Sequence, residues 1–373
     1  MNILFACGGT AGHVNPAVAL AKLFRQHDPD CGILFVGADD GMETRLVPKE
    51  GFDIRTVTIS GFQRSMAPAS IMHNFHTLLN MNKSKKQSAK ILDEFQPDLA
   101  VGTGGYASFP IVKAAAARGI PTAVHESNAV PGLTTQALSK VVDLVMVGFE
   151  ESRNHYENPE KVVVTGTPVR GDFFRYTKKE ARSALGIPED KPLVLSYWGS
   201  LGAEVMNGYM ADFLTFLNRD GVPFCHIHGA GRDYAALTGK LKAAGVDCSG
   251  ANGLEVREYI YDMPTVMAAA DLVLCRAGAS TLAELSAIGK PAVLVPSPNV
   301  TADHQTKNAR VLSSAGGAIL MPEAECSAES LYHTTVELLS RRDKLEEMSR
   351  SLKALGTANA AEQIYEALLK LLH

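Results

Sequence analysis

The chain has 373 residues, of which 46% are hydrophobic and 20% are charged, and its formal net charge is −4 at pH 7. This length predicts two domains, because a single hydrophobic core stops growing at roughly 250–300 residues, and the composition is typical of a soluble globular protein. The net charge argues against a general nucleic-acid binder. The six cysteines include no C-x-x-C pair, which predicts reduced thiols in a cytosolic protein. No apolar run approaches the roughly 18 residues of a membrane span.

Strands alternate with helices along the whole chain, which predicts parallel sheets. The expected strands are 3–6, 33–36, 99–102, 122–125, 144–147 and 162–165 in the first half, and 193–198, 224–228, 272–275 and 292–295 in the second. Residues 166–192 are rich in glycine, proline and charge, and they mark a linker and its flanks. Each half is therefore expected to form a Rossmann-like domain, with a cleft between the two domains.

A glycine-rich turn, Cys7-Gly-Gly-Thr-Ala-Gly-His13, follows the first strand, and apolar residues at helical spacing follow the turn. Glycine lets a ligand approach the backbone closely, while Thr10 and His13 place a hydroxyl and an imidazole at the start of the helix. We interpret the turn as ligand-binding; the alternative is that His13 is only a solvated or capping side chain. The glycine spacing differs from G-x-G-x-x-G, although Asp39 and Asp40 after the second strand keep a dinucleotide site open as a weaker alternative.

The most informative stretch is 270–309, where two buried strands are each followed by polar residues. The first strand is followed by Arg276, by Ser280 and Thr281 as N-cap candidates, and by a short helix that stops at Gly289. The second is followed by a polar loop that carries Asp303, His304, Gln305 and Asn308. In an open α/β sheet, the loops after the strands' carboxyl ends form the ligand crevice, and helix N-termini there attract anions. The stretch therefore predicts a site for a phosphorylated ligand.

Glu284 in this stretch has two interpretations. Thr281-x-x-Glu284 matches a capping box, in which the glutamate accepts a hydrogen bond from the N-cap amide. Alternatively, a carboxylate one turn into the helix accepts hydrogen bonds from ribose hydroxyls. The local pattern does not separate the two.

Polar residues and glycines also follow three other strands, at 102–106, 125–128 and 198–203, and a helix beginning near Glu204 makes the last of these a phosphate cradle. No D-x-D sequence lies in a suitable loop, so we expect neither a metal nor a cofactor. Cys225-His-Ile-His228 suggests zinc, but we expect its members to face opposite sides of a strand. The chain has no G-x-S-x-G and no Walker A motif, which argues against a hydrolase and a P-loop ATPase.

Six motifs occur in order along nearly the whole chain: GGTAGH, HESNAVPGLT, GTPVR, GSLGA, CRAGASTLAE and DHQTKNA. Together they resemble the MurG family, the peptidoglycan N-acetylglucosaminyltransferases of bacteria. The resemblance implies an α/β fold of two Rossmann-like domains facing a central cleft, the GT-B glycosyltransferase fold. We expect an acceptor domain at 1–166 and a UDP-sugar domain at 167–349, with a C-terminal helix at about 350–373 that packs back on the first domain.

The resemblance also implies a reaction. The family transfers N-acetylglucosamine from UDP-GlcNAc to the C4 hydroxyl of undecaprenyl-pyrophosphoryl-N-acetylmuramoyl-pentapeptide (lipid I), and the product is lipid II, with inversion at the anomeric carbon. Transfer to a sugar hydroxyl requires a base to take its proton. His13 is the expected general base, with Glu126 and His125 as alternatives. Departing UDP gathers negative charge, which helix N-termini and Arg276 can stabilise without a metal.

The family's substrate contacts carry over to Thr10, Ala11, Gly12, Asn128, Arg170, Ser200, Ile260, Arg276, Ala279, Ser280, Thr281, Glu284, Gln305 and Asn308. In this set Glu284 becomes a ribose ligand, the backbone of Ile260 contacts uracil and Gln305 contacts sugar hydroxyls. The chain departs from the family pattern at Leu201, Thr135 and His304, where the family often has glutamine, asparagine and glutamine.

Residues 66–90 combine an apolar helical face with a run of lysines: Ile71, Phe75, Leu78 and Leu79, then Lys83, Lys85, Lys86 and Lys90. The pattern fits a core helix followed by a solvated charge run, or a patch that binds an anionic membrane surface. A lipid-linked acceptor favours the patch. We therefore expect a peripheral protein at the cytoplasmic face of the bacterial plasma membrane, with UDP-GlcNAc, lipid I and the membrane as partners. The alternatives are a GT-B enzyme acting on another lipid, a UDP-sugar epimerase and a UDP-sugar-binding protein of the same fold.

Overall fold

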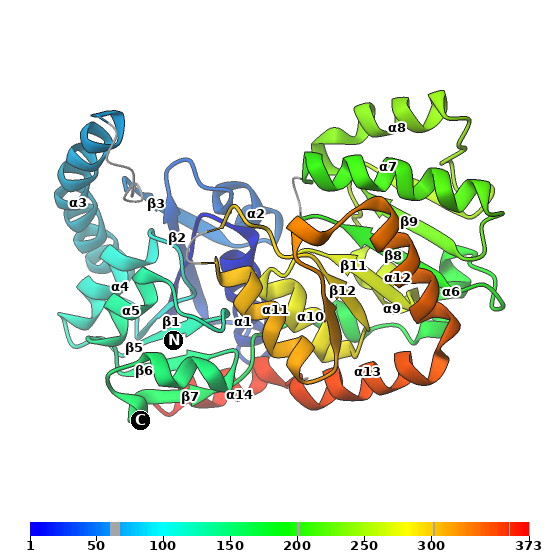
Figure 1. The fold of residues 1–373 in the computed structure, drawn as a ribbon. Coiled ribbons are helices and arrows are strands. Elements are labelled where there is room, and N and C mark those ends of the chain that lie inside the picture. Colours follow the sequence, from blue (N-terminus) through cyan, green and yellow to red (C-terminus); the bar gives the residue numbers. More distant parts are fainter. Residues whose placement is uncertain (60–67, 200–201, 301–302, 358, 373) are drawn as a thin grey trace. The chain divides into compact units, whose positions relative to one another are not determined.

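The computed structural model describes residues 1–59, 68–199, 202–300, 303–357 and 359–372, with the backbone alone for 68–81. The chain forms two compact units (Figure 1). Unit 1 comprises Met1–Arg170 and Asn359–His373, and unit 2 comprises Gly171–Ala358. The first unit therefore ends at Arg170, a few residues beyond the expected boundary at 166.

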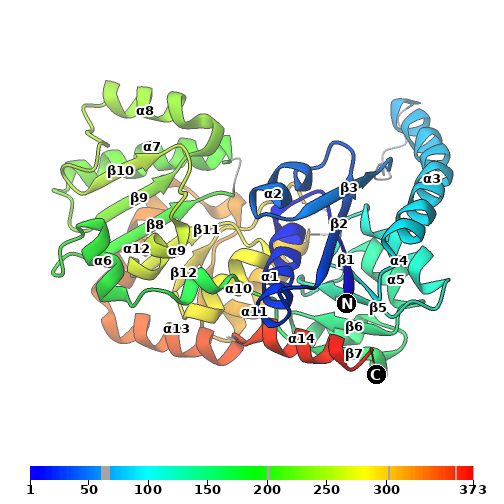
Figure 2. The ribbon, with the colours of Figure 1, turned by 180° about the vertical axis from the view of Figure 1, so that it is seen from behind.

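Unit 1 contains a seven-stranded parallel sheet with the strand order β3-β2-β1-β4-β5-β6-β7. Its strands are β1 (Asn2–Ala6), β2 (Gly32–Ala38), β3 (Asp53–Val57), β4 (Leu99–Gly102), β5 (Thr122–Glu126), β6 (Leu144–Val147) and β7 (Val162–Val164). Its helices are α1 (Ala11–His27), α2 (Glu43–Lys49), α3 (Pro68–Phe95), α4 (Ser108–Ala116), α5 (Leu133–Ser139) and α14 (Ala360–Leu369). Helices cover both faces of the sheet (Figures 1 and 2).

Two hydrophobic cores lie on the two faces of this sheet, because successive strand residues point to opposite sides. Phe5 of β1 packs in the core that includes residues of α1 and α14. Its neighbour Leu4 packs in the other core, with residues of α3, α4 and α5. A strand buried on both faces reads as a continuous apolar run, which is why the sequence predicted β1.

Unit 2 contains a six-stranded parallel sheet with the order β10-β9-β8-β11-β12-β13. Its strands are β8 (Leu193–Tyr197), β9 (Cys225–Gly229), β10 (Leu254–Arg257), β11 (Leu272–Cys275), β12 (Ala292–Leu294) and β13 (Ala318–Leu320). Its helices are α6 (Lys178–Leu185), α7 (Glu204–Arg219), α8 (Tyr234–Ala243), α9 (Met263–Ala269), α10 (Ala279–Ile288), α11 (His304–Ser314), α12 (Ala328–Ser340) and α13 (Arg342–Leu355). Both units are thus Rossmann-like, and every strand that we expected is present.

The strands that the sequence analysis missed, β3, β10 and β13, all lie at sheet edges. An edge strand has one neighbour and part of it meets solvent, so its sequence can lack the continuous apolar run of a buried parallel strand. In Asp53-Ile-Arg-Thr-Val57, for example, exposed and partly buried residues alternate, and charged residues interrupt Leu254-Glu-Val-Arg257. Strand β13 is apolar but only three residues long, whereas the edge strand β7, a run of three valines, was predicted.

The C-terminal segment forms two helices that belong to different units, where we expected one helix at about 350–373. Helix α13 ends at Leu355, before Gly356, and its Met348 is buried in the core of unit 2. Helix α14 packs on α1 of unit 1, where Ile364 and Leu368 are fully buried. Only the segment from Asn359 onward belongs to unit 1.

Candidate active site

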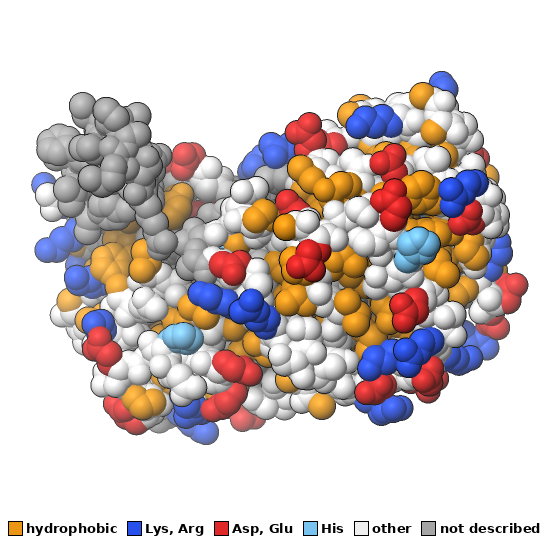
Figure 3. Space-filling model, viewed as in Figure 1, with side chains coloured by type: hydrophobic (Ala, Val, Ile, Leu, Met, Phe, Trp, Pro, Cys, Tyr) orange, Lys and Arg blue, Asp and Glu red, His pale blue; other side chains and the backbone are white. Residues whose placement is uncertain are grey.

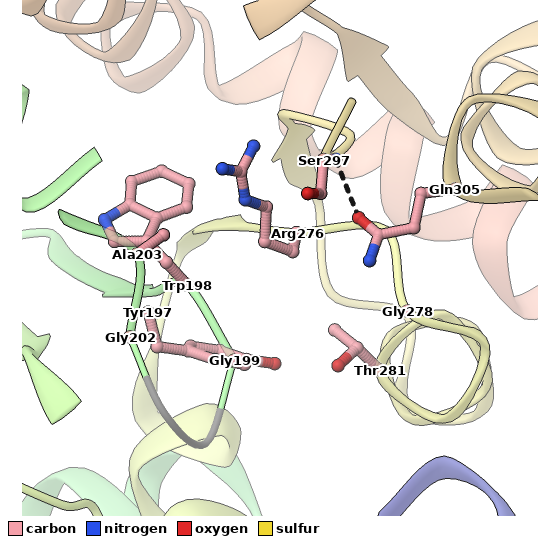
Figure 4. A pocket seen from close by; sticks show the side chains of 10 residues that line it. All are labelled: Tyr197, Trp198, Gly199, Gly202, Ala203, Arg276, Gly278, Thr281, Ser297 and Gln305. Atoms are coloured by element: carbon pink, nitrogen blue, oxygen red, sulfur yellow. Dashed lines mark hydrogen bonds between the residues drawn. The ribbon is translucent and has the colours of Figure 1, made fainter. Parts of the chain in front are cut away.

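A pocket in unit 2 lies where the strand order of the sheet reverses. Strands β8 and β11 are neighbours at the centre of the sheet, with β9 and β10 on one side and β12 and β13 on the other. In open α/β sheets, ligands bind at the carboxyl ends of the strands at this position. The pocket is lined by Tyr197, Trp198, Gly199, Gly202, Ala203, Arg276, Gly278, Thr281, Ser297 and Gln305 (Figure 4).

The pocket lining comes from strand ends and from helix starts. Tyr197 ends β8, Arg276 follows β11, and the start of α10 supplies Gly278 and Thr281. The first N–H groups of a helix have no partner within the helix, and the helix dipole is positive at that end. The pocket therefore offers backbone donors to an anion such as a phosphate group. The structure brings the predicted residues Arg276, Thr281 and Gln305 together here. It adds two residues that were not predicted: Tyr197, the last residue of β8, and Ser297, in the loop after β12.

The amide of Gln305 has a fixed orientation at the pocket. The backbone N–H of Ser297 donates to Gln305 Oε1 at 2.9 Å, the dashed line in Figure 4. Because the oxygen is engaged, the amide presents its N–H donors to the pocket, on the side of Thr281 (Figure 4). Gln305 lies in the first turn of helix α11, which begins at His304, so the polar loop that we expected over 303–308 is wrong.

Arg276 lines the pocket, but its guanidinium is already bound. Its Nη1 donates to Val295 O at 3.0 Å and to Pro296 O at 3.1 Å, and its Nη2 pairs with a carboxylate oxygen of Glu323 at 2.5 Å. The predicted contact between Arg276 and a phosphate would therefore compete with Glu323. It stays a prediction.

The capping-box interpretation of Thr281 and Glu284 is wrong. The N-cap of α10 is Gly278, no side chain caps the helix, and Thr281 is the third helical residue. Its side chain faces the pocket (Figure 4). The helix ends as predicted at Gly289, which has φ +69°. With the cap excluded, ribose binding is the remaining prediction for Glu284.

The other predicted contacts of unit 2 that the structure describes are not part of the pocket lining. Ser200 lies outside the described residues, while Ala279 and Ser280 form the first turn of α10. Asn308 is buried and donates to Ala277 O at 3.4 Å. Ile260 is 5% exposed, and its backbone contact with uracil stays a prediction.

The two histidines of β9 lie on the same face of the strand, contrary to our expectation. His226 and His228 both contact the hydroxyl of Ser196, because residues two apart on a strand point the same way. Within the described ranges, no three His, Cys, Asp or Glu side chains are placed to hold a metal ion.

In unit 1, the glycine turn after β1 orients His13. The carbonyl oxygen of Gly8 lies 2.8 Å from His13 Nδ1, and Thr103 Oγ1 donates to His13 O at 2.7 Å. The turn after β4 packs closely against this turn: a Cβ at Gly104 would lie 2.6 Å from the imidazole, and one at Gly105 would lie 2.1 Å from Gly8 O. Both glycines have positive φ, so other residues would be strained there as well. The two turns meet where the strand order of unit 1 reverses, between β1 and β4.

A buried carboxylate that the sequence analysis missed supports the same turn. Glu43, in the first turn of α2, is fully buried; its Oε1 accepts from Ala38 N at 2.8 Å and its Oε2 from Gly9 N at 3.1 Å. The glycines in Gly37-Ala-Asp-Asp-Gly41 are a signal that could have indicated it, because a Cβ at either end would clash with this carboxylate. Asp39, the acid in the dinucleotide alternative, instead accepts a hydrogen bond from Thr58 at 2.7 Å.

The two alternative bases both have partners within unit 1. Glu126 is 4% exposed; its Oε1 accepts from the backbone and side-chain amides of Asn128, and its Oε2 accepts from Gly132 N. His125 is fully buried, and its Nε2 lies 2.9 Å from Gly166 O. Burial lowers the pKa of His125. Glu126 therefore organises the loop after β5, His125 contacts the segment that follows β7, and His13 remains the half-buried candidate.

The remaining predicted residues of unit 1 lie close to these turns or at its end. Thr10 is the exposed N-cap of α1, and Ala11 and Gly12 form the first helical turn. Asn128 lies in the loop after β5, and Arg170 is the last residue of the unit before Gly171.

The predicted membrane segment lies on α3, and the structure describes only part of it. The side chains of the apolar residues Ile71, Phe75, Leu78 and Leu79 lie outside the described residues. Lys83, Lys85, Lys86 and Lys90 are exposed, while Ser84, Ser88 and Ile91 on the same helix are buried. Basic side chains border this edge of unit 1 (Figure 3). Within the described ranges, no helix has the length and apolar character that a membrane span requires.

Two family models match most of the chain. Residues 3–147 match the N-terminal domain of glycosyltransferase family 28, and residues 194–364 match its C-terminal domain. The chain is 40% identical, over 98% of its length and 97% of the relative's, to a protein of Acetivibrio thermocellus named UDP-N-acetylglucosamine–N-acetylmuramyl-(pentapeptide) pyrophosphoryl-undecaprenol N-acetylglucosamine transferase. A protein of the same name from Thermoanaerobacter sp. is 41% identical over 98% of both chains. Among solved structures, MurG of Acinetobacter baumannii aligns over 99% of both chains with a TM-score of 0.76 and 29% identity.

Proposed function

The chain belongs to glycosyltransferase family 28, and on that premise we propose that it transfers N-acetylglucosamine from UDP-GlcNAc to the C4 hydroxyl of lipid I, forming lipid II with inversion at the anomeric carbon. The observation that carries the proposal is an identity of 40–41%, over nearly the full length, to relatives named for this transfer. The pocket of unit 2 supports it, because backbone donors and a hydroxyl and an amide side chain suit a nucleotide sugar.

The donor is proposed to bind in unit 2. Its diphosphate would meet the N-terminus of α10 and the glycine turn between β8 and α7, where negative charge is favoured. Glu284 would accept the ribose hydroxyls, and the N–H groups of Gln305 would donate to sugar oxygens. The bond from Ser297 already holds the Gln305 amide, so this side chain would need little ordering on binding.

His13 is proposed to act as the general base. The C4 oxygen attacks the anomeric carbon from the side opposite UDP, and its proton moves to His13 Nε2 as the new C–O bond forms. The bond between the anomeric carbon and the diphosphate oxygen breaks, and UDP leaves with the electron pair. Backbone donors at the diphosphate stabilise the charge that develops on the leaving group.

The lipid-linked acceptor is proposed to reach the protein from a membrane surface. The exposed lysines of α3 support contact with anionic head groups, each lysine adding about 1 kcal/mol to binding. The protein would then be peripheral, at the cytoplasmic face of the plasma membrane, where a nucleotide sugar is available.

Release of UDP from UDP-GlcNAc, measured with and without a lipid I analogue, tests the proposed function. A transferase of this kind releases UDP only when the acceptor is present, and it converts the analogue to a product carrying N-acetylglucosamine. Release or isomerisation of the donor without acceptor would indicate an epimerase instead. Binding of UDP-GlcNAc without turnover in either case would indicate a sugar-nucleotide-binding protein.

A further inference from the structure

A buried hydrogen-bond network of polar side chains lies beneath the glycine turn of the unit 2 pocket. Its members, each at most 3% exposed, are Ser196 on β8, His226 and His228 on β9, and Asn207 on α7. Ser196 Oγ lies 2.7 Å from both His226 Nε2 and His228 Nδ1. His228 Nε2 lies 3.0 Å from Asn207 Oδ1, and Asn207 Nδ2 donates to Ala230 O at 2.8 Å.

The chemistry of the partners fixes the direction of every hydrogen bond in this network. A carbonyl oxygen only accepts, so Asn207 Nδ2 faces Ala230 and Oδ1 faces His228. His228 Nε2 must therefore carry the proton, and Nδ1 of the neutral ring accepts from the Ser196 hydroxyl. Because that hydroxyl proton is committed, Ser196 Oγ accepts from His226 Nε2. All the donors point from His226 toward Ala230.

Both imidazoles are neutral at physiological pH. Burial lowers the pKa of His228 to about 3 and holds the pKa of His226 well below its ordinary value. The remaining ring nitrogen, His226 Nδ1, is buried without a hydrogen-bond partner among the described residues. In the tautomer derived above it carries no proton, so no buried N–H is left unsatisfied.

The hydrogen-bond network ends at the glycine turn of the pocket. Gly202 lines the pocket with φ +77°, and a Cβ there would lie 2.4 Å from Ala230 O and 3.2 Å from Asn207 Nδ2. Asn207 Nδ2 also lies 2.9 Å from Asp233 Oδ2, in the helical turn that follows Ala230. Asn207 therefore holds the carbonyl against which the backbone of Gly202 packs.

We propose that His228 and Asn207 are positioning residues for the donor, which fix the Ala230 carbonyl and through it the glycine turn that receives the diphosphate. The proposal rests on the proposed function, because it takes a nucleotide sugar as the ligand. His228 keeps the Asn207 amide in the one orientation that places its N–H groups on Ala230 and Asp233. Neither residue touches the ligand. The direction of the hydrogen bonds makes His226 dispensable for the pocket, because His226 donates to Ser196 at the end of the network that is remote from Ala230.

Four variants separate positioning of the glycine turn from general stability. His228→Leu and Asn207→Leu interrupt the hydrogen bonds that connect Ser196 to Ala230. His226→Phe is the matched control, because it removes one buried hydrogen bond and fits the aromatic surroundings of Phe213 and Phe224, yet it leaves the bonds from Ser196 to Ala230 intact. His228→Gln is the conservative variant, since its amide can both donate to Asn207 and accept from Ser196.

UDP binding to each folded variant is measured by isothermal titration, and donor KM and kcat by UDP release. We expect the Kd for UDP and the donor KM to rise about tenfold or more in His228→Leu and Asn207→Leu, with kcat at saturating donor within about twofold of the original chain. The Kd should stay within about twofold in His226→Phe and should recover in His228→Gln.

An unchanged Kd for UDP in His228→Leu and Asn207→Leu would overturn the proposal. An equal rise of the Kd in His226→Phe would also overturn it, because the whole network would then contribute only to stability. Failure of the proposed function is distinguishable, because an epimerase or a UDP-sugar-binding protein would still allow the Kd comparison, whereas a protein that binds no UDP would not. In that case hydrogen exchange of peptides containing Gly202 and Ala203 still tests the positioning role: exchange faster in His228→Leu than in His226→Phe supports it, and equal exchange overturns it.

Discussion

His13 donates its Nδ1 proton to the carbonyl oxygen of Gly8, 2.8 Å away, and this contact decides which ring nitrogen is basic. Since a carbonyl only accepts, Nδ1 carries the proton in the neutral ring and Nε2 has the lone pair. The turn thus presents the imidazole as a base at Nε2, and any change that releases Nδ1 from Gly8 also loses control of the tautomer.

Replacement of His13 by alanine is expected to lower turnover by about 10²–10⁴-fold, because no other group in the turn can take the acceptor proton. UDP binding, measured by isothermal titration, should change little. Glu126→Gln is the control for the alternative base, and its turnover should fall less than that of His13→Ala. Near-normal turnover in His13→Ala would remove His13 from the mechanism.

Replacement of Glu284 by alanine is expected to weaken UDP binding strongly. Two hydrogen bonds from ribose to a charged acceptor would be lost, each contributing roughly 1.5–3 kcal/mol. The N-cap of α10 is Gly278, so the variant removes no capping bond, and the melting temperature of the ligand-free protein is measured beside the Kd. An unchanged Kd combined with a lower melting temperature would contradict ribose binding and indicate a structural role.

Replacement of Glu43 by glutamine is expected to destabilise unit 1. Both carboxylate oxygens accept backbone N–H groups in a fully buried position, so the amide nitrogen of glutamine would face a donor. The free energy of unfolding in urea should fall by about 1–3 kcal/mol, and turnover should fall because the His13 turn loses its support. Glu94→Gln, on the surface of the same unit, is the control. Equal stability of both variants would be evidence against the role given to Glu43.

Unit 2 is expected to lose stability as the pH falls below about 6.5. The pKa of His228 is about 3 in the folded state and that of His226 is also strongly lowered, whereas both are near 6.5 in the unfolded chain. Between these values the unfolded chain binds more protons, so its free energy falls relative to the folded state by up to about 1.4 kcal/mol per pH unit for each histidine.

Fluorescence of Trp198 can follow this loss, since Trp198 is the sole tryptophan and belongs to unit 2. Urea unfolding at pH 7, 6 and 5 gives the slope. His228→Gln removes one titrating group and should make the slope shallower. A slope equal to that of the unaltered chain would show that His228 is not responsible.

Replacement of Lys83, Lys85 and Lys86 by glutamate is expected to reduce sedimentation with vesicles that contain anionic lipid. These lysines are exposed, and each contributes about 1 kcal/mol near a negative surface. Activity on a short-chain acceptor in solution should be retained, because none of the three lysines belongs to the pocket of unit 2 or to the glycine turns of unit 1. Unaffected vesicle binding would place the membrane contact elsewhere.

Most of the fold follows from patterns that the sequence carries locally. A strand buried on both faces, such as Leu272–Cys275, is a continuous apolar run, and a glycine with positive φ, such as Gly289, ends a helix. The edge strands β3 and β10 were missed because polar residues interrupt their apolar pattern. Thr281 was assigned to the cap because Thr-x-x-Glu is a common local pattern, while the N-cap at Gly278 depends on how the loop leaves β11.

The candidate site was predicted where one residue carries the chemistry and missed where the chemistry depends on long-range packing. His13, Thr281 and Gln305 stand beside strand ends that the sequence reveals. Glu43 accepts an N–H group from a residue 34 positions away, and Asn207 orients its amide by contacts to the next strand and turn. No local pattern encodes such partners.

The packing of α14 on α1 has a consequence for synthesis of the chain. Phe24 near the start and Ile364 near the end share one core, and the ring of Tyr365 lies 4.7 Å from that of Phe24. A ribosome makes the chain from the amino end, so unit 1 leaves it first but keeps an open apolar surface until residues 360–369 emerge. Unit 2, contiguous in sequence, can close its core earlier. The domain made first is therefore finished last, and a ribosome that stalls before α14 would release a chain with that surface exposed.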